Sequence, residues 1–131
     1  RQDSENPVYY VQYAHARICS LIKILAGDGV EVPAAEDAKL ELLTAPEEIA
    51  LIKKLAALPA DIASAARDRD PSRVNKYVVD AAGDFHRFYN ACRIRGAEAD
   101  LMAARLKLAA ATRDIIAMSL AVIGVSAPES M

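Results

Sequence analysis

The sequence has 131 residues, the length of one ordinary domain, which is enough to bury a sizeable core. Hydrophobic residues make up 53% and charged residues 26%, so the composition excludes a disordered chain. The net charge of −2 argues against a strong nonspecific nucleic-acid binder, and no apolar run approaches the roughly 20 residues of a membrane span. Two cysteines without a Cys-x-x-Cys pair are typical of buried thiols in a reducing compartment, so we expect a cytoplasmic protein.

A first helix is predicted over residues 7–26. Asn6-Pro7 is a typical helix start, because an N-cap residue precedes a proline at the first helical position. Gly27 stands where a glycine often ends a helix. One face of this helix repeats at intervals of three and four residues and is mostly apolar: Val8, Val11, His15, Ile18, Ile22 and Leu25.

Turn-forming and acidic residues predominate over residues 27–38, where we predict a loop, followed by a short helix near 39–43. Thr44-Ala45-Pro46-Glu47 fits a capping box in which the Glu47 carboxylate reaches back to the Thr44 amide. A helix near 46–57 follows it. Its apolar stripe is Leu51, Ile52 and Leu55. Because burying a carboxylate requires partners, two acidic pairs are interpreted as solvated: Glu36-Asp37 and Glu47-Glu48.

Three more helices are predicted in the rest of the chain. Pro59 begins one that runs to about Arg67, and Asp70-Pro71 begins a long buried helix over 71–94, before Gly96. The last helix covers 98–123 and precedes Gly124 and a short tail. The two long helices have these apolar stripes: Val74, Val78, Ala81, Phe85, Phe88 and Cys92 in one, and Leu101, Ala104, Leu108, Ala111, Ile115, Met118 and Val122 in the other.

These elements predict an all-α fold. No segment combines strand alternation with hairpin signals, so we expect a helical bundle of five to six helices, three of them long, with short connections. Residues 1–131 form one domain in this interpretation, without an internal repeat. The sequence begins without an initiator Met and without a signal-peptide core, so we expect a fragment of a larger protein.

No motif in the chain predicts catalysis. A nucleophile elbow, a Walker loop, a dinucleotide fingerprint and a zinc signature are all absent from the sequence, so we expect no catalytic residue, cofactor or metal in it. His15 lies on the apolar stripe of the first helix and is interpreted as a hydrogen-bonded core or interface residue. His86 lies on a polar-leaning face of helix 71–94, and a structural role is the preferred interpretation.

Tyrosines crowd the start of the first helix at positions 9, 10 and 13. Tyr10, Tyr13 and Arg17 are spaced i, i+3, i+7 and share a face that is offset from the apolar stripe. Two phenolic rings beside a guanidinium are suited to stacking on unpaired bases. Partly buried packing with satisfied hydroxyls is the alternative, and spacing alone favours it.

Basic side chains are unevenly distributed. Residues 1–66 carry 6 basic and 10 acidic side chains, whereas residues 67–131 carry 10 basic and 8 acidic ones. The second half therefore permits a local phosphate-facing patch without demonstrating it. A solvated or ion-paired face explains its basic residues equally well: Arg87, Arg93, Arg95, Arg105, Lys107 and Arg113.

Four segments resemble a known family. They are Asn6-Pro-Val-Tyr-Tyr-Val-Gln-Tyr-Ala-His-Ala-Arg17, Asp84-Phe-His-Arg-Phe-Tyr-Asn-Ala-Cys92, Arg105-Leu-Lys-Leu-Ala-Ala-Ala-Thr-Arg113 and Gly124-Val-Ser-Ala-Pro-Glu-Ser-Met131. In this order they are similar to segments of the C-terminal anticodon-binding (DALR-type) domain of arginyl-tRNA synthetases. Ser130 stands where the family usually has arginine, and Met118-Ser-Leu where many members have Asn-Gly-Leu. The H-I-G-H and K-M-S-K-S motifs of the family's catalytic domain are absent from the sequence.

The resemblance implies a helical domain that holds the anticodon stem-loop of tRNA-Arg. A catalytic domain elsewhere in the same chain would join arginine to the tRNA with ATP, and we expect a monomer with no membrane contact. Gln12 and His15 are expected to orient helices or contact that catalytic domain. The resemblance also implies that anticodon bases meet the first helix, the 27–33 loop and the C-terminus, so the first helix and the C-terminal tail must come together in space. The residues expected to contact the bases are Tyr10, Tyr13, Arg17 and Met131, with Tyr89 as a lesser candidate.

Two alternatives remain open. The chain could be a related helical domain of another synthetase subunit, such as a bacterial glycyl-tRNA synthetase β subunit, although the segment 6–17 argues against it. It could also be a protein-interaction bundle that no longer binds RNA, which is compatible with the net charge of −2.

Overall fold

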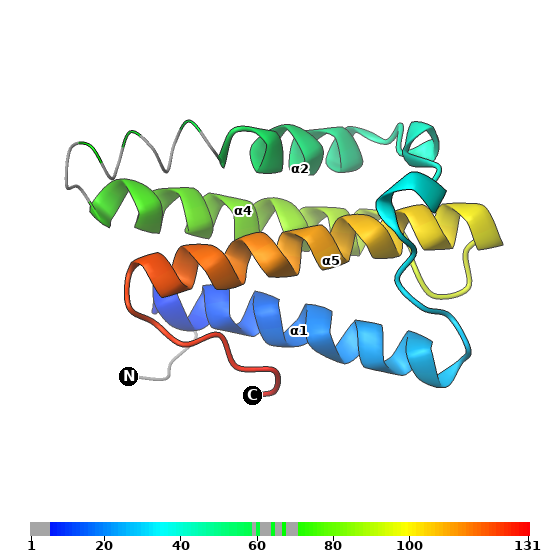
Figure 1. Ribbon diagram of the computed structural model, residues 1–131, viewed down its shortest axis with the longest axis horizontal. Coiled ribbons are helices and arrows are strands. Elements are labelled where there is room, and N and C mark those ends of the chain that lie inside the picture. The colour runs from blue at the N-terminus through cyan, green and yellow to red at the C-terminus, as the bar shows by residue number, and fades with distance from the viewer. Residues whose placement is uncertain (1–5, 59, 61–63, 65–66, 68–70) are drawn as a thin grey trace.

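The computed structural model describes residues 6–58, 60, 64, 67 and 71–131, and in these parts of the chain the only regular elements are helices. The all-α class is therefore confirmed, but the described residues contain four α-helices where five or six helices were predicted for the chain. The predicted helix from Pro59 to Arg67 lies outside the described residues, apart from three positions. The elements are α1 (Pro7–Gly27), the 3₁₀ helices η1 (Ala35–Asp37) and η2 (Leu40–Leu42), α2 (Pro46–Ala56), α4 (Pro71–Ala91) and α5 (Ala99–Val122) (Figure 1).

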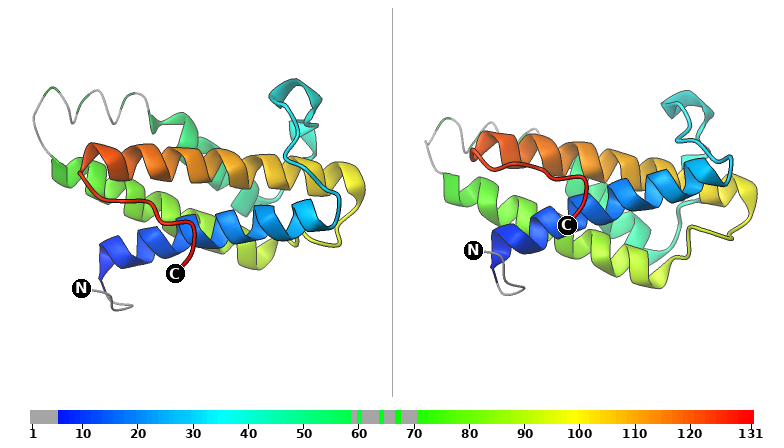
Figure 2. Two further views of the ribbon diagram at one scale, coloured as in Figure 1. Left: turned by 60° about the horizontal axis from the view of Figure 1, so that its bottom comes forward. Right: turned by 90° about the horizontal axis from the view of Figure 1, so that it is seen from below.

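The helices pack as a bundle in which α4 and α5 lie between α1 and α2 (Figures 1 and 2). The stripes predicted for α1 and α4 form its core, with Val11, Ile18, Phe85 and Phe88 at most 1% exposed. Burying side chains of this size contributes roughly 1.5–3 kcal/mol each. None of the described helices has the length and apolar character that crossing a bilayer requires.

The stripe predicted for α5 is partly wrong. Met118 and Val122 are 46% and 56% exposed, whereas other faces of the helix are buried. The reason is that α5 contacts α1, α2, α4 and η2, so several of its faces are covered at once. Ile52 of α2 is likewise exposed rather than buried. The α5 side chains that are buried outside the predicted stripe are Leu106, Ala109, Ala110, Thr112, Ile116, Ser119 and Leu120.

The start of α2 differs from its predicted cap by one residue. The carboxylate that reaches back belongs to Glu48, which accepts a hydrogen bond from the Ala45 amide at 2.9 Å. Glu48 is also 1% exposed, and its second oxygen lies 2.6 Å from Nε of Arg105 on α5. The prediction of a solvated Glu48 is therefore wrong, because a partner 57 residues away compensates its charge.

The C-terminal tail returns from α5 to lie along α1 (Figure 2). Gly124 adopts a φ of +77° as the chain leaves α5, a conformation that favours glycine. Gln12 Nε2 then donates to the Ser126 carbonyl at 3.0 Å, and His15 Nδ1 donates to the Pro128 carbonyl at 2.8 Å. The first helix and the tail thus lie together as predicted. His15, at 5% exposure, is a hydrogen-bonded interface residue whose partner is the tail.

Candidate nucleic-acid interface

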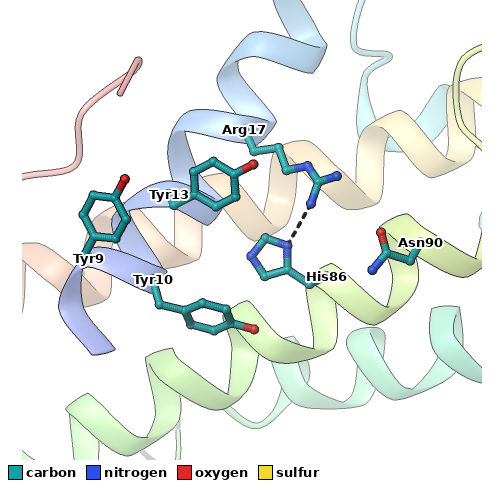
Figure 3. Close-up of a pocket in the computed structure, with 6 residues that line it drawn as sticks. All are labelled: Tyr9, Tyr10, Tyr13, Arg17, His86 and Asn90. Atoms are coloured by element: carbon teal, nitrogen blue, oxygen red, sulfur yellow. Dashed lines mark hydrogen bonds between the residues drawn. The ribbon is translucent and has the colours of Figure 1, made fainter. Parts of the chain in front are cut away.

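Two neighbouring pockets open along α1 and share Tyr13 and Arg17. The larger, about 500 Å³, lies between α1 and α4 (Figure 3). The smaller, about 230 Å³, lies between α1 and the C-terminal tail. Their linings are Tyr9, Tyr10, Tyr13, Arg17, His86 and Asn90 for the first, and Tyr13, Ala16, Arg17, Ser20, Glu129, Ser130 and Met131 for the second.

Helical spacing places these side chains on facing surfaces. On α1, Tyr10, Tyr13 and Arg17 follow one another at three and four residues, so they form a row along one face. On α4, Tyr89 and Asn90 lie three and four residues after His86, so they share a face with it. Because α1 and α4 pack against each other, the two rows meet at the pocket.

His86 lies between two tyrosine rings (Figure 3). Its ring centroid is 5.1 Å from that of Tyr10 and 5.9 Å from that of Tyr13, with the Tyr13 ring stacked at an interplanar angle of 22°. Tyr10 is half-buried and packs against the core, while Tyr13 is 44% exposed. Packing therefore accounts for Tyr10, whereas Tyr13 keeps a surface that a ligand ring can reach.

Arg17 is held by uncharged partners. Its Nη1 lies 3.2 Å from His86 Nδ1, and its guanidinium carbon lies 3.9 Å from the centroid of the Tyr89 ring. Among the described residues, Arg17 makes no ion pair with a carboxylate. A guanidinium only donates hydrogen bonds, so His86 Nδ1 accepts and the proton of the neutral imidazole lies on Nε2.

Burial and the nearby Arg17 charge lower the pKa of His86 below its ordinary value, which favours this neutral form. The Nε2 atom is buried and has no hydrogen-bond partner among the described residues. The His86 ring at the larger pocket therefore keeps a buried N–H donor that no described residue satisfies, a state that is rare for buried polar groups.

The structure gathers the sequence-predicted residues around Arg17. Tyr10 and Tyr13 share its larger pocket, Tyr89 lies under its guanidinium, and Met131, at 51% exposure, shares the smaller pocket with it. The predicted 27–33 loop lines neither pocket, because it begins at the opposite end of α1 (Figure 1).

Sequence reasoning missed three of the residues that line the larger pocket. Tyr9 was noted only as part of a cluster, Asn90 was not considered, and His86 was given a structural role. His86 and Asn90 are four residues apart in the segment 84–92, which carries the family resemblance, and this was the available signal. Their position opposite Arg17 depends on packing between segments 69 residues apart, which no local pattern shows.

Most of the arginines proposed as phosphate partners are ion-paired instead. Arg87 pairs with Asp84, Arg95 with Asp28, Arg105 with Glu48 and Arg113 with Asp114. This favours the ion-paired interpretation for these four. The described residues contain no group of three or more His, Cys, Asp or Glu side chains suited to a metal ion. Burial raises the pKa of both thiols, although Cys19 is only half-buried.

The fold and the site define a class: helical domains that present aromatic and basic side chains suited to unpaired bases. Residues 11–131 match the family model described as the DALR anticodon binding domain, and the chain belongs to this family.

Similar proteins are arginine–tRNA ligases. The chain is 50% identical over 131 residues to that of Ruminiclostridium cellulolyticum and 48% identical over 131 residues to that of Acetivibrio thermocellus. In each case the match covers 100% of this chain and 23% of the relative, so the chain spans about a quarter of their length. The solved arginyl-tRNA synthetase of Thermus thermophilus superposes with a TM-score of 0.85 at 29% identity, over 98% of this chain and 22% of that one.

Proposed function

We propose that the chain is the anticodon-binding domain of an arginine–tRNA ligase and that it holds the anticodon stem-loop of tRNA-Arg. The observation that carries the proposal is the gathering of Tyr10, Tyr13, Tyr89 and Met131 around Arg17, which makes no ion pair with a carboxylate of the described residues. Arginine activation with ATP would take place in another domain of a longer chain. This domain would contribute RNA binding and no catalytic residue.

In this proposal, the exposed Tyr13 ring receives an unpaired base. Stacking of a base on an aromatic side chain contributes roughly 1–3 kcal/mol. Tyr10 is the fixed wall behind His86, because its ring is packed against the core. Met131 closes the opposite side of Tyr13, where its polarizable side chain can pack on the same base.

Arg17 supplies charge and hydrogen-bond donors beside that base. A cation over an aromatic ring gains about 0.5–1 kcal/mol at exposed sites, so Tyr89 restricts the guanidinium before RNA arrives. His86 uses one of the five guanidinium donors, which leaves others for a phosphate or a base edge.

The proposal is tested by measuring the binding of fluorescent anticodon stem-loops to the chain by anisotropy at several salt concentrations. We expect salt-sensitive binding that is tighter for the tRNA-Arg loop than for an unrelated loop. Tyr13→Ala should weaken binding roughly 5- to 150-fold, the equivalent of one lost stacking interaction. Arg113→Ala is the control, because this arginine pairs with Asp114 and lines neither pocket.

Equal affinity for both loops at moderate salt would contradict an anticodon-specific role. The same conclusion would follow if Tyr13→Ala bound like the unaltered chain while Arg113→Ala bound normally, since Tyr13 would then serve packing alone.

A further inference from the structure

A third pocket, of about 320 Å³, continues the site toward the end of α4. Its lining includes Tyr89 and Asn90, which also belong to the surroundings of Arg17. The three pockets are thus linked through shared side chains: Tyr13 and Arg17 join the tail pocket to the central one, and Asn90 joins the central pocket to this one. A strand lying in the central pocket would therefore extend into the third.

The third pocket is lined by two arginines, Arg93 and Arg95. Arg93 is exposed and makes no ion pair among the described residues, so its charge faces solvent uncompensated. Arg95 pairs with Asp28 through two contacts of 3.0 and 3.4 Å, but both partners are well exposed and such a pair is weak. The local charge is therefore positive, and an anion can compete with Asp28 for Arg95.

The backbone beneath these arginines is fixed. Arg105 donates from Nη1 to the Arg93 carbonyl at 2.6 Å, while its Nε is held by the buried Glu48 carboxylate. The segment that carries Arg93 is thereby tied to α5 and α2, although its side chain remains in solvent. A binding site on a rigid support loses less conformational entropy when a ligand orders it.

We infer that Arg93 and Arg95 form a phosphate-binding subsite for the RNA backbone, next to the base held at Tyr13 and Arg17. This inference rests on the proposed function, since it takes an RNA strand as the ligand. The third pocket is lined by two cations and by Tyr89, a partly buried ring that already carries the Arg17 guanidinium over one face. It would therefore contribute affinity that is independent of base identity, and Tyr13 would contribute the part that depends on the loop.

The proposed roles predict that variants of the phosphate subsite and of Tyr13 change the salt dependence of RNA binding in different ways. Each phosphate neutralised by a cation contributes about 0.7 to the slope of log K against log salt for a single strand. Arg93→Ala should lower that slope by about 0.7 and weaken tRNA-Arg and unrelated loops by the same factor. Tyr13→Ala should weaken binding without changing the slope. Asp28→Asn should tighten binding and steepen the slope, because it frees Arg95 from its carboxylate.

The variants are compared by anisotropy titrations of both loops over a salt series, with Arg113→Ala as the matched arginine control and helix content checked by circular dichroism. Folding of Arg93→Ala is expected to be intact, because the interaction that fixes this residue uses its carbonyl. If the unaltered chain binds no RNA at low salt, both proposals are wrong. If it binds and Tyr13→Ala behaves as expected while Arg93→Ala keeps the full slope, only the phosphate subsite is wrong. An affinity loss for one loop alone on Arg93→Ala would equally overturn it.

Discussion

Arg17 and Arg105 show two uses of the same side chain in one bundle. Arg105 lies 2.6 Å from a carboxylate that is 1% exposed, so its charge is compensated inside the protein. Arg17 lies between a neutral imidazole and a tyrosine ring, at the border of two open pockets. The first arrangement joins α5 to α2 and to the segment that follows α4, while the second leaves a positive charge oriented toward solvent. Compensation, rather than the presence of arginine, therefore separates a structural cation from one available to a ligand.

The comparison predicts its largest effect at the compensated arginine. Arg105→Met should lower the free energy of unfolding by roughly 3–5 kcal/mol, because it leaves the Glu48 carboxylate buried without a charged partner. Urea denaturation followed by circular dichroism measures this. The double variant Glu48→Gln with Arg105→Met is the control, and it should recover part of the loss. If Arg105→Met alone lowered the free energy of unfolding by less than about 1 kcal/mol, the pair of Glu48 and Arg105 would be no stronger than an ordinary surface ion pair.

A smaller effect is expected where the tail meets α1. His15→Leu removes the donor to the Pro128 carbonyl and leaves that group unsatisfied, at a cost of about 1–3 kcal/mol. His15→Asn keeps a donor near the position of Nδ1 and should retain most of the stability. The release of Met131 by carboxypeptidase should be faster for His15→Leu than for His15→Asn. Equal rates for the two variants would mean that the hydrogen bond does not hold the tail.

The uncompensated arginine should behave in the opposite way to Arg105. Arg17→Met removes a charge whose partner is neutral, so it leaves no buried ion behind. We expect the free energy of unfolding to change by at most about 1 kcal/mol, the size of the lost cation–π contact with Tyr89. The affinity for the tRNA-Arg loop should nevertheless fall by about tenfold, the equivalent of one charge-assisted hydrogen bond. If Arg17→Met lowered the free energy of unfolding as much as Arg105→Met does, Arg17 would also be a structural cation, and the proposed difference between the two arginines would be wrong.

These two regions also show what the sequence could and could not predict. The start of α1 depends on Asn6-Pro7, whose cap bond spans two residues, so the local pattern was sufficient. The row of Tyr10, Tyr13 and Arg17 likewise depends only on helical spacing. The contacts of each arginine depend instead on partners 57 and 69 residues away. The burial of Glu48 was therefore misjudged, and the contact of His86 with Arg17 was not predicted.

The family resemblance supplied what spacing alone could not. Helical spacing alone favoured simple packing for the tyrosine face. The resemblance added Met131 and Tyr89 to the candidate residues, and the structure places both beside Arg17. The resemblance also assigned the 27–33 loop to the bases, but in the structure this loop lines neither pocket, because it begins at the far end of α1. The loop meets the proposed phosphate subsite instead, through the pair of Asp28 with Arg95.

The smallest expected effect is the pH dependence that His86, the hydrogen-bond partner of Arg17, gives to the stability of the chain. The folded-state pKa of His86 is lowered from its ordinary value of 6.5 by burial and by Arg17, so the folded chain favours the neutral ring. As the pH falls through about 6.5, the unfolded chain takes up this proton before the folded chain does, and stability is lost until the lower folded pKa is reached. Above the ordinary value both states are neutral, and His86 adds no pH dependence.

His86→Gln removes this titration, so the quantity to measure is the difference in unfolding free energy between the unaltered chain and His86→Gln across the pH series. We expect that difference to shift against the unaltered chain on acidification, with a slope below that of one full proton. Protonation also turns Nδ1 into a donor that faces the donors of Arg17, so the contact of 3.2 Å should be lost and the guanidinium released. A difference that stays constant through this range, or that favours the unaltered chain in acid, would show that Arg17 is not held by a neutral histidine.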